Sequence, residues 1–234
     1  RYIGVTGVQT CALPIWAKAE SRQVPAKAAA EFRKSQEAFN DGKIDKAVQY
    51  LRNGIALDPG NPDIVYVGTG EANFSGDSYY GVGLLKSPDG GKTWRHIPGP
   101  FAGPFALNFS GRGARIGAIA IHPRDTKIVI AAMSLAGAAM PVTGLYRSAD
   151  AGETWTQVLS GVPGTDIVID PSNPNTMYAG AGRSGEATAG VYKSTDAGVT
   201  WTRLTGGLPV GAETGRVALA LAPSAPSVIY AGIA

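Results

Sequence analysis

An eight-residue phrase of the form Ser-x-Asp-x-Gly-x-Thr-Trp occurs three times in this chain of 234 residues. It reads SPDGGKTW at residues 87–94, SADAGETW at 148–155 and STDAGVTW at 194–201, and the segment GLLKS, GLYRS or GVYKS leads into each copy. Such repetition restricts the fold to a stack of similar small units, because a unit of this size cannot bury its own faces without neighbours.

A second phrase alternates with the first and recurs four times from residue 55 onward. It consists of an apolar strand, a proline turn and another apolar strand, with key prolines at Pro59, Pro123, Pro171 and Pro223. Short strands separated by Gly, Pro and Asp turns predict an antiparallel meander. Four such strands in a repeat of about 45 residues match one blade of a β-propeller. The 32 glycines fit this large number of tight turns.

The residues of the eight-residue phrase suit a tight turn between two strands. The Asp can accept hydrogen bonds from backbone N–H groups of the turn, the Gly can take a positive φ, and the Trp offers a large apolar body for packing. We therefore predict a structural and not a catalytic role for Ser87, Asp89, Gly91, Thr93, Trp94, Ser148, Asp150, Gly152, Thr154, Trp155, Ser194, Asp196, Gly198, Thr200 and Trp201.

These phrases resemble the Asp-box, or bacterial neuraminidase repeat, family of β-propellers, which includes sortilin-like propellers, sialidases, xyloglucan-cleaving glycosidases and a photosystem assembly factor. The resemblance implies that the box is a structural hairpin away from the central ligand-binding face. The expected fold class is mainly β, an incomplete β-propeller of four-stranded antiparallel blades in residues 54–234. Three repeats and the start of a fourth are too few for most closed propellers, so we expect a fragment with open edges and an uncovered apolar face.

The segment before the repeats has a different character. Residues 5–15, VTGVQTCALPI, resemble a translated sequencing adapter, so residues 1–16 are expected to be an artefact or a disordered leader. Residues 17–53 carry strong helix formers and helical apolar spacing, and they resemble one tetratricopeptide-like helical hairpin through Ala38, Gly42, Ala47, Leu51 and Pro59. We predict a short α-helical hairpin there, which is a remnant of a longer array, a packing pair or a second artefact.

Composition excludes several classes of site. The single Cys11 rules out an internal disulfide, and one Cys with two His is too few for a structural zinc site, so we expect no metal and no cofactor. No apolar run reaches the roughly 18 residues of a membrane span. Residues 1–53 hold nine Lys and Arg against five Asp and Glu, which leaves 12 against 13 in residues 54–234. The propeller region is therefore near neutral, which argues against nucleic acid, and its lack of Cys fits an exported protein.

Two insertions hold the candidate ligand-binding residues. Residues 68–83, GTGEANFSGDSYYGVG, place polar and aromatic groups on a Gly-rich loop, and residues 98–115 add phenylalanines and arginines. Such loops suit carbohydrate or peptide contact, although an ordered surface loop is the simpler alternative. A further loop, residues 182–190, offers Arg183 and Glu186 and predicts a solvated turn. The candidates are Glu71, Asn73, Asp77, Tyr79, Tyr80, Arg112 and Arg115.

The chain lacks recognisable catalytic phrases. Arg115-Ile116 is followed by Gly117 and not by the Pro of the sialidase phrase, and the Asp-Val-Gly-Gly phrase of xyloglucan-cleaving relatives is absent. We therefore expect a non-enzymatic binding or scaffold module whose intact parent binds protein, peptide or glycan. The alternative is a fragment of a sialidase- or xyloglucanase-like glycoside hydrolase with its catalytic residues in missing blades. A scaffold similar to the photosystem assembly factor is the second alternative.

Overall fold

The computed structural model describes residues 55–70, 72, 74, 83–97, 114–134, 143–222 and 225–234. The expected leader at 1–16 and the helical hairpin at 17–53 lie outside the described residues. The described part is all β, with three four-stranded antiparallel sheets and one two-stranded sheet. Within these ranges no helix is long and apolar enough to cross a membrane.

Each sheet is a meander in which consecutive strands are hydrogen-bonded neighbours. The first sheet contains β1 (Ile55–Leu57), β2 (Val65–Gly68), β3 (Leu84–Ser87) and β4 (Arg95–His96). The second contains β5 (Arg115–Ile121), β6 (Val129–Ser134), β7 (Gly144–Ser148) and β8 (Thr156–Ser160). The third contains β9 (Gly164–Ile169), β10 (Met177–Ala181), β11 (Gly190–Ser194) and β12 (Thr202–Arg203). The last pairs β13 (Val217–Ala222) with β14 (Ala225–Ile233).

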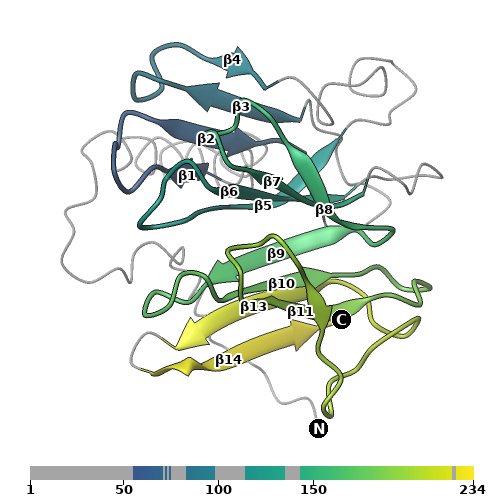
Figure 1. Ribbon diagram of the computed structural model, residues 1–234. Helices are drawn as coiled ribbons and strands as arrows, with labels where there is room; N and C mark the ends of the chain where they lie inside the picture. The colour runs from purple at the N-terminus through teal and green to yellow at the C-terminus, as the bar shows by residue number, and fades with distance from the viewer. Residues whose placement is uncertain are drawn as a thin grey trace, which may run out of the picture.

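The sheets are stacked in chain order, from β1–β4 to β13–β14 (Figure 1). The first strand of each sheet contacts the first two strands of the sheet before it, so that β1, β5, β9 and β13 follow one another through the stack. This arrangement fits a partial β-propeller, in which four-stranded sheets are arranged around a central axis. The prediction of a mainly β fold with four-stranded antiparallel units is confirmed for the described residues.

The pattern of buried and exposed residues along a strand shows whether one or both faces of its sheet are covered. Every residue of β6 is buried, because the second sheet has a neighbour on both faces. In β13 buried and exposed residues alternate, with Val217 and Leu219 buried and Ala218 and Ala220 exposed. Side chains of a strand point alternately to the two faces of its sheet, so the last sheet is covered on one face within the described part of the chain.

Three apolar clusters fill the spaces between sheets. Tyr66, Ile116 and Val129 belong to the first cluster, Ile130 and Met177 to the second, and a smaller third cluster lies between the last two sheets. The backbones approach closely at these boundaries. A Cβ on Gly68 would lie 2.5 Å from the Ile116 side chain, so only glycine permits this packing of β2 on β5.

The proline turns between first and second strands share one capping pattern. Asp58 Oδ1 accepts a hydrogen bond from Gly60 N at 2.7 Å, and Asp170 Oδ1 accepts one from Ser172 N at 2.8 Å. His122 takes the same place in the second sheet, where its Nδ1 accepts from Asp125 N at 3.0 Å. A side chain that accepts from the following backbone holds the tight turn in place, which gives His122 a role in turn geometry.

Candidate functional site

A pocket of about 370 Å³ lies where three segments distant in sequence meet. Phe74 comes from the segment between β2 and β3, Arg183 follows β10, and Arg216 precedes β13. The complete lining is Phe74, Arg183, Ser184, Glu213, Gly215, Arg216 and Ala234. The pocket therefore combines loops of the first, third and fourth sheets.

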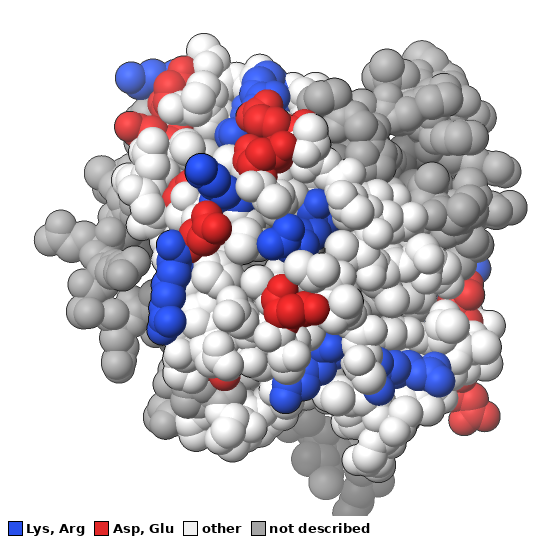
Figure 2. All heavy atoms as spheres, in the orientation of Figure 1, with Lys and Arg blue, Asp and Glu red and all other residues white. Residues whose placement is uncertain are grey.

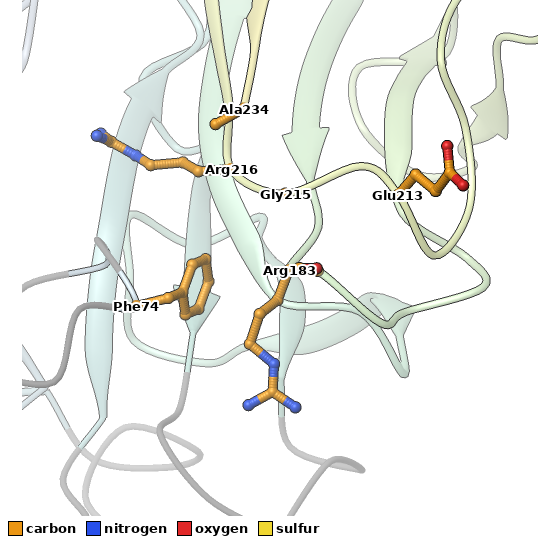
Figure 3. A pocket seen from close by; sticks show the side chains of 7 residues that line it. Phe74, Arg183, Glu213, Gly215, Arg216 and Ala234 are labelled. Carbon is orange, nitrogen blue, oxygen red and sulfur yellow. The ribbon is translucent and has the colours of Figure 1, made fainter.

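The lining side chains differ in direction (Figure 3). The Phe74 ring lies near Arg183, whereas the Glu213 carboxylate and the Arg216 guanidinium extend to opposite sides of the view. Arg183 donates to Glu186 Oε1 at 3.1 Å, and the two side chains are 38% and 19% exposed. The ion pair orients the guanidinium and leaves part of it open to solvent. Residues 182–190 are thus more than the solvated turn that the sequence predicts.

Backbone pairing forms the wall that carries Gly215 and Arg216. Gly215 N donates to Ala234 O at 2.5 Å, and Ala234 N donates to Arg216 O at 3.0 Å. On the adjacent loop, Gly185 N donates to Ala212 O at 2.7 Å. These bonds link the loop after β10 to the loop before β13, so a rigid backbone supports both arginines.

The only described carboxylate with a raised pKa lies next to this wall. Burial raises the pKa of Asp166. Its carboxylate accepts from Leu219 N at 2.7 Å and from Ile167 N at 2.8 Å. A raised pKa in a buried acid can mark a functional group, but these two bonds join β9 to β13. Asp166 therefore holds the third and fourth sheets together.

The chemistry of the pocket suits binding more than bond cleavage. An aromatic ring, a partly exposed guanidinium and a carboxylate are groups that recognise the apolar face and the hydroxyls of a sugar. Glycoside hydrolysis requires two carboxyl groups about 5 to 10 Å apart. Glu213 is the single acidic residue in the pocket lining, so the lining does not contain such a pair of carboxyl groups.

The predicted ligand-binding residues are placed only in part. Arg115 begins β5 and is 3% exposed, so it is a buried residue and not an open rim. The other candidates lie outside the described residues: Glu71, Asn73, Asp77, Tyr79, Tyr80 and Arg112. They stay predictions. Phe74 belongs to the same Gly-rich loop, so that loop does supply a pocket residue.

The three box loops, residues 87–94, 148–155 and 194–201, have the same hydrogen bonds. In the second loop Asp150 Oδ1 accepts from Ser148 Oγ at 2.7 Å and from Thr154 N at 2.8 Å, and Oδ2 accepts from the Thr154 hydroxyl at 2.5 Å. The other two loops repeat this set, and in each the Trp indole donates to the carbonyl of the box glycine.

These hydrogen bonds keep the box carboxylates ionised. The Thr154 hydroxyl, followed by its backbone N–H, lowers the pKa of Asp150 to about 2, and Thr200 does the same for Asp196. For Asp89 the backbone N–H of Thr93 is the largest cause of a pKa near 2. An acid with so low a pKa is a poor proton donor near neutral pH.

Charge on the visible face is mixed. Figure 2 shows basic and acidic side chains interspersed over this face, without a large area of one sign. Among the described residues, no group of three or more His, Cys, Asp or Glu side chains is placed to hold a metal ion. The chemistry of the site therefore depends on its aromatic, guanidinium and carboxylate groups.

Comparison with known proteins points to one enzyme class. Over 128 residues, 52% of this chain, it is 38% identical to a xyloglucanase of Paenibacillus sp.. It is 34% identical to a xyloglucanase of Acetivibrio thermocellus over 134 residues, and 31% identical to one of Hypocrea jecorina over 140 residues, which are 56% and 59% of this chain. The matched part spans only 11% to 16% of the length of these three curated relatives. No protein-family model matches the chain.

Solved structures agree on the fold. An ancestral GH74 enzyme superposes with a TM-score of 0.53 at 26% identity, over 77% of this chain and 21% of that protein. The GH74 xyloglucanase of Xanthomonas campestris gives a TM-score of 0.51 at 21% identity, over 77% of this chain and 26% of that protein. Both structures support the prediction of a propeller-type fold.

The expectation of a non-enzymatic binding or scaffold module is wrong. The relatives that match in sequence are named xyloglucanases, so they favour the alternative of a glycoside hydrolase. The absence of catalytic phrases concerns only these residues, which match 11% to 16% of the length of those relatives. The same relatives support a carbohydrate ligand and do not support the expected protein or peptide ligand.

Proposed function

We propose that this chain is part of a glycoside hydrolase of the GH74 type that acts on xyloglucan. The observation that carries the proposal is the 31% to 38% identity to proteins named xyloglucanase over more than half of the chain. Residues 54–234 form consecutive blades of its propeller, and the box loops serve as structural turns. An enzyme that cleaves a plant polysaccharide meets its substrate outside the cell, which is consistent with an exported protein.

Within this enzyme, the pocket acts as a sugar-binding subsite. The Phe74 ring stacks on the face of one sugar ring, and Arg183, oriented by Glu186, donates hydrogen bonds to sugar hydroxyls. Glu213 is the one carboxylate of the pocket lining, so the catalytic pair comes from residues outside this pocket. We propose Glu71 and Asp77, on the loop that contributes Phe74, as candidates for that pair.

The test is electrophoresis of the chain through a gel that contains soluble xyloglucan. Retardation relative to a gel without polysaccharide is expected, and it is expected to fall at least threefold in Phe74→Ala because the stacking surface is lost. Val199→Ala is the matched control, since Val199 is 50% exposed on a box loop and does not line the pocket. An unsubstituted β-glucan in the gel measures the selectivity for xyloglucan.

Two results would contradict the proposal. If xyloglucan does not retard the chain, the described blades contain no subsite. If Phe74→Ala and Val199→Ala are retarded as strongly as the unmodified chain, the pocket is not the subsite, and binding occurs elsewhere.

A further inference from the structure

The boundary between the first and second sheets contains a paired hydrogen-bond contact. Tyr66 of β2 and Lys86 of β3 are directly opposite each other in the sheet register. Both donate to the same acceptor, Ala151 O in the second box loop, at 2.6 Å from the Tyr hydroxyl and 2.7 Å from Lys Nζ. Ala151 has a φ of +58°, in the left-handed region. This turn carries its carbonyl to the preceding sheet.

The next boundary repeats this contact one repeat later. Ile130 of β6 and Arg147 of β7 are opposite each other, and Arg147 Nε donates to Ala197 O at 2.9 Å. Ala197 has a φ of +57°, as Ala151 has +58°. Ile130 cannot donate, but it packs where Tyr66 packs, because a Cβ on Gly198 would lie 2.6 Å from Ile130 Cδ1.

We call this arrangement the clamp: a side chain of the second strand and a basic residue of the third strand that together hold the next box loop. The shared feature is a basic side chain that donates to the carbonyl of a left-handed box residue. The additional ion pair between Lys86 and Glu153, at 3.1 Å, is specific to the first clamp, since Val199 takes the place of Glu153 in the third box. The clamp thus uses backbone chemistry that any box loop can offer.

The third sheet has the same pair of positions, and among the described residues this pair holds no box loop. Tyr178 of β10 and Lys193 of β11 are opposite each other. Lys193 Nζ lies 5.5 Å from the centroid of the Tyr178 ring, the same distance as Lys86 Nζ from the Tyr66 ring. Within the described part of the chain, neither the Tyr178 hydroxyl nor Lys193 Nζ makes a hydrogen bond. Two donors of the same kind as in the first clamp are therefore available.

We propose that Tyr178 and Lys193 form the docking site for the box loop that completes the fourth blade, and that the left-handed residue of this loop offers its carbonyl to both donors. The occupant is a strand–box–strand hairpin of the kind formed by residues 144–160 and 190–203, which adds to β14. We expect this hairpin to make the same contact as in the two occupied clamps, in which a basic side chain donates to a box carbonyl. This inference concerns assembly of the propeller and does not depend on the sugar-binding pocket.

The last sheet has room for this hairpin, because β14 pairs only with β13 among the described residues. Tyr230 of β14 stands in the repeat at the position of Tyr66 and Tyr178, since VYVG, MYAG and IYAG align. Tyr66 is fully buried, but Tyr230 is 63% exposed and Val228 is 42% exposed, so the face of the fourth sheet that a following blade would cover is open in the described part of the chain. A hairpin that pairs with β14 would continue the fourth sheet, in the same order that the other three sheets show.

The test extends the chain after Ala234 with a copy of residues 183–204, which hold a loop, a third strand, a box and a fourth strand. The extended chain is expected to unfold at a higher urea concentration than the original. Combining the extension with Tyr178→Phe and Lys193→Met is expected to reduce the folding equilibrium constant about tenfold, because two hydrogen bonds are lost. In the unextended chain, the same pair of substitutions is expected to change the folding equilibrium constant less than twofold. An extension with the reversed order of residues is the control.

Several results would overturn the proposal. One such result is that the reversed extension stabilises the chain as much as the forward extension. Another is that the two substitutions lower the stability of the extended and unextended chains equally. Dimerisation of the unextended chain in analytical ultracentrifugation, abolished by Lys193→Met, would make a second copy the occupant. If the extended chain does not fold, the unextended chain still decides: Lys86→Met should lower its stability markedly and Lys193→Met should not. Equal effects of these two would contradict the clamp.

Discussion

Gly144 and Gly161 both have a positive φ, but only one of them has room for a side chain, so alanine at the two positions should differ in its effect on stability. Gly144 opens β7 with a φ of +142°, and Gly161 follows β8 with a φ of +75°. A Cβ at Gly144 would lie 1.8 Å from Leu159 O, whereas a Cβ at Gly161 meets no atom within 4 Å. The two positions therefore share backbone strain but differ in steric clash.

The magnitudes follow from these distances. A left-handed L residue costs about 1 to 2 kcal/mol, and the loss of unfolded-state freedom on Gly→Ala returns about 0.4 to 1 kcal/mol. Gly161→Ala should therefore destabilise by about 1 kcal/mol. Gly144→Ala adds a clash with backbone that cannot rotate away, and it forces apart the Gly144–Ser160 pair of β7 and β8. We expect it to cost more than about 4 kcal/mol.

The assay is urea unfolding of both variants and the unmodified chain, followed by tryptophan fluorescence. The expected result is a small shift of the midpoint for Gly161→Ala, and a large shift or no folded protein for Gly144→Ala. Equal midpoints for the two variants would refute the reasoning, because the close approach of β8 to Gly144 would then not affect the free energy of unfolding.

Three further predictions concern the box, the clamp and the core. Asp150 has a pKa near 2 in the folded chain against an ordinary value of 3.8, so it adds stability above about pH 4 that is lost as the pH falls toward 2. Asp150→Asn should therefore be less stable than the unmodified chain near pH 7, and the difference should shrink in acid, as urea midpoints across that range would record; a constant difference would contradict the hydrogen-bond account. Tyr66→Phe removes a hydrogen bond and should cost about 1 kcal/mol, with Tyr178→Phe as the matched control that leaves the thermal midpoint unchanged. Ile130→Ala, in a fully buried position between sheets, should cost about 2 to 5 kcal/mol, while the exposed Val228→Ala should cost less than about 0.5 kcal/mol, by the same urea assay.

The repeat made the fold predictable because each structural element carries its own local signal. The proline turns at Pro59, Pro123 and Pro171 and the three box loops marked the ends of strands, and the strand GVYKS before the third box became β11. The hydrogen bonds of the box followed from the residue types, since an Asp beside a Gly and a Thr in a tight turn has backbone donors within reach.

The pocket was not predictable from the same signals, because its residues come together only through the stacking of sheets. Phe74 and Arg216 are separated by more than a hundred residues, and neither stands in a motif. Arg115 was expected at an open rim and is buried, because β5 lies between the first strands of neighbouring sheets. The clamp did leave a signal: Lys86, Arg147 and Lys193 each precede the Ser of a box. A basic residue repeated beside a structural turn indicates a contact with the next repeat.

The central claim, that this chain belongs to an enzyme that cleaves xyloglucan, is tested most directly by the complete protein that contains it. The measurement is the release of new reducing ends from xyloglucan and, in parallel, from an unsubstituted β-glucan. Our account predicts release from xyloglucan at a rate at least tenfold above that from the unsubstituted glucan. No release from xyloglucan by a folded complete protein, or equal release from both polysaccharides, would contradict it.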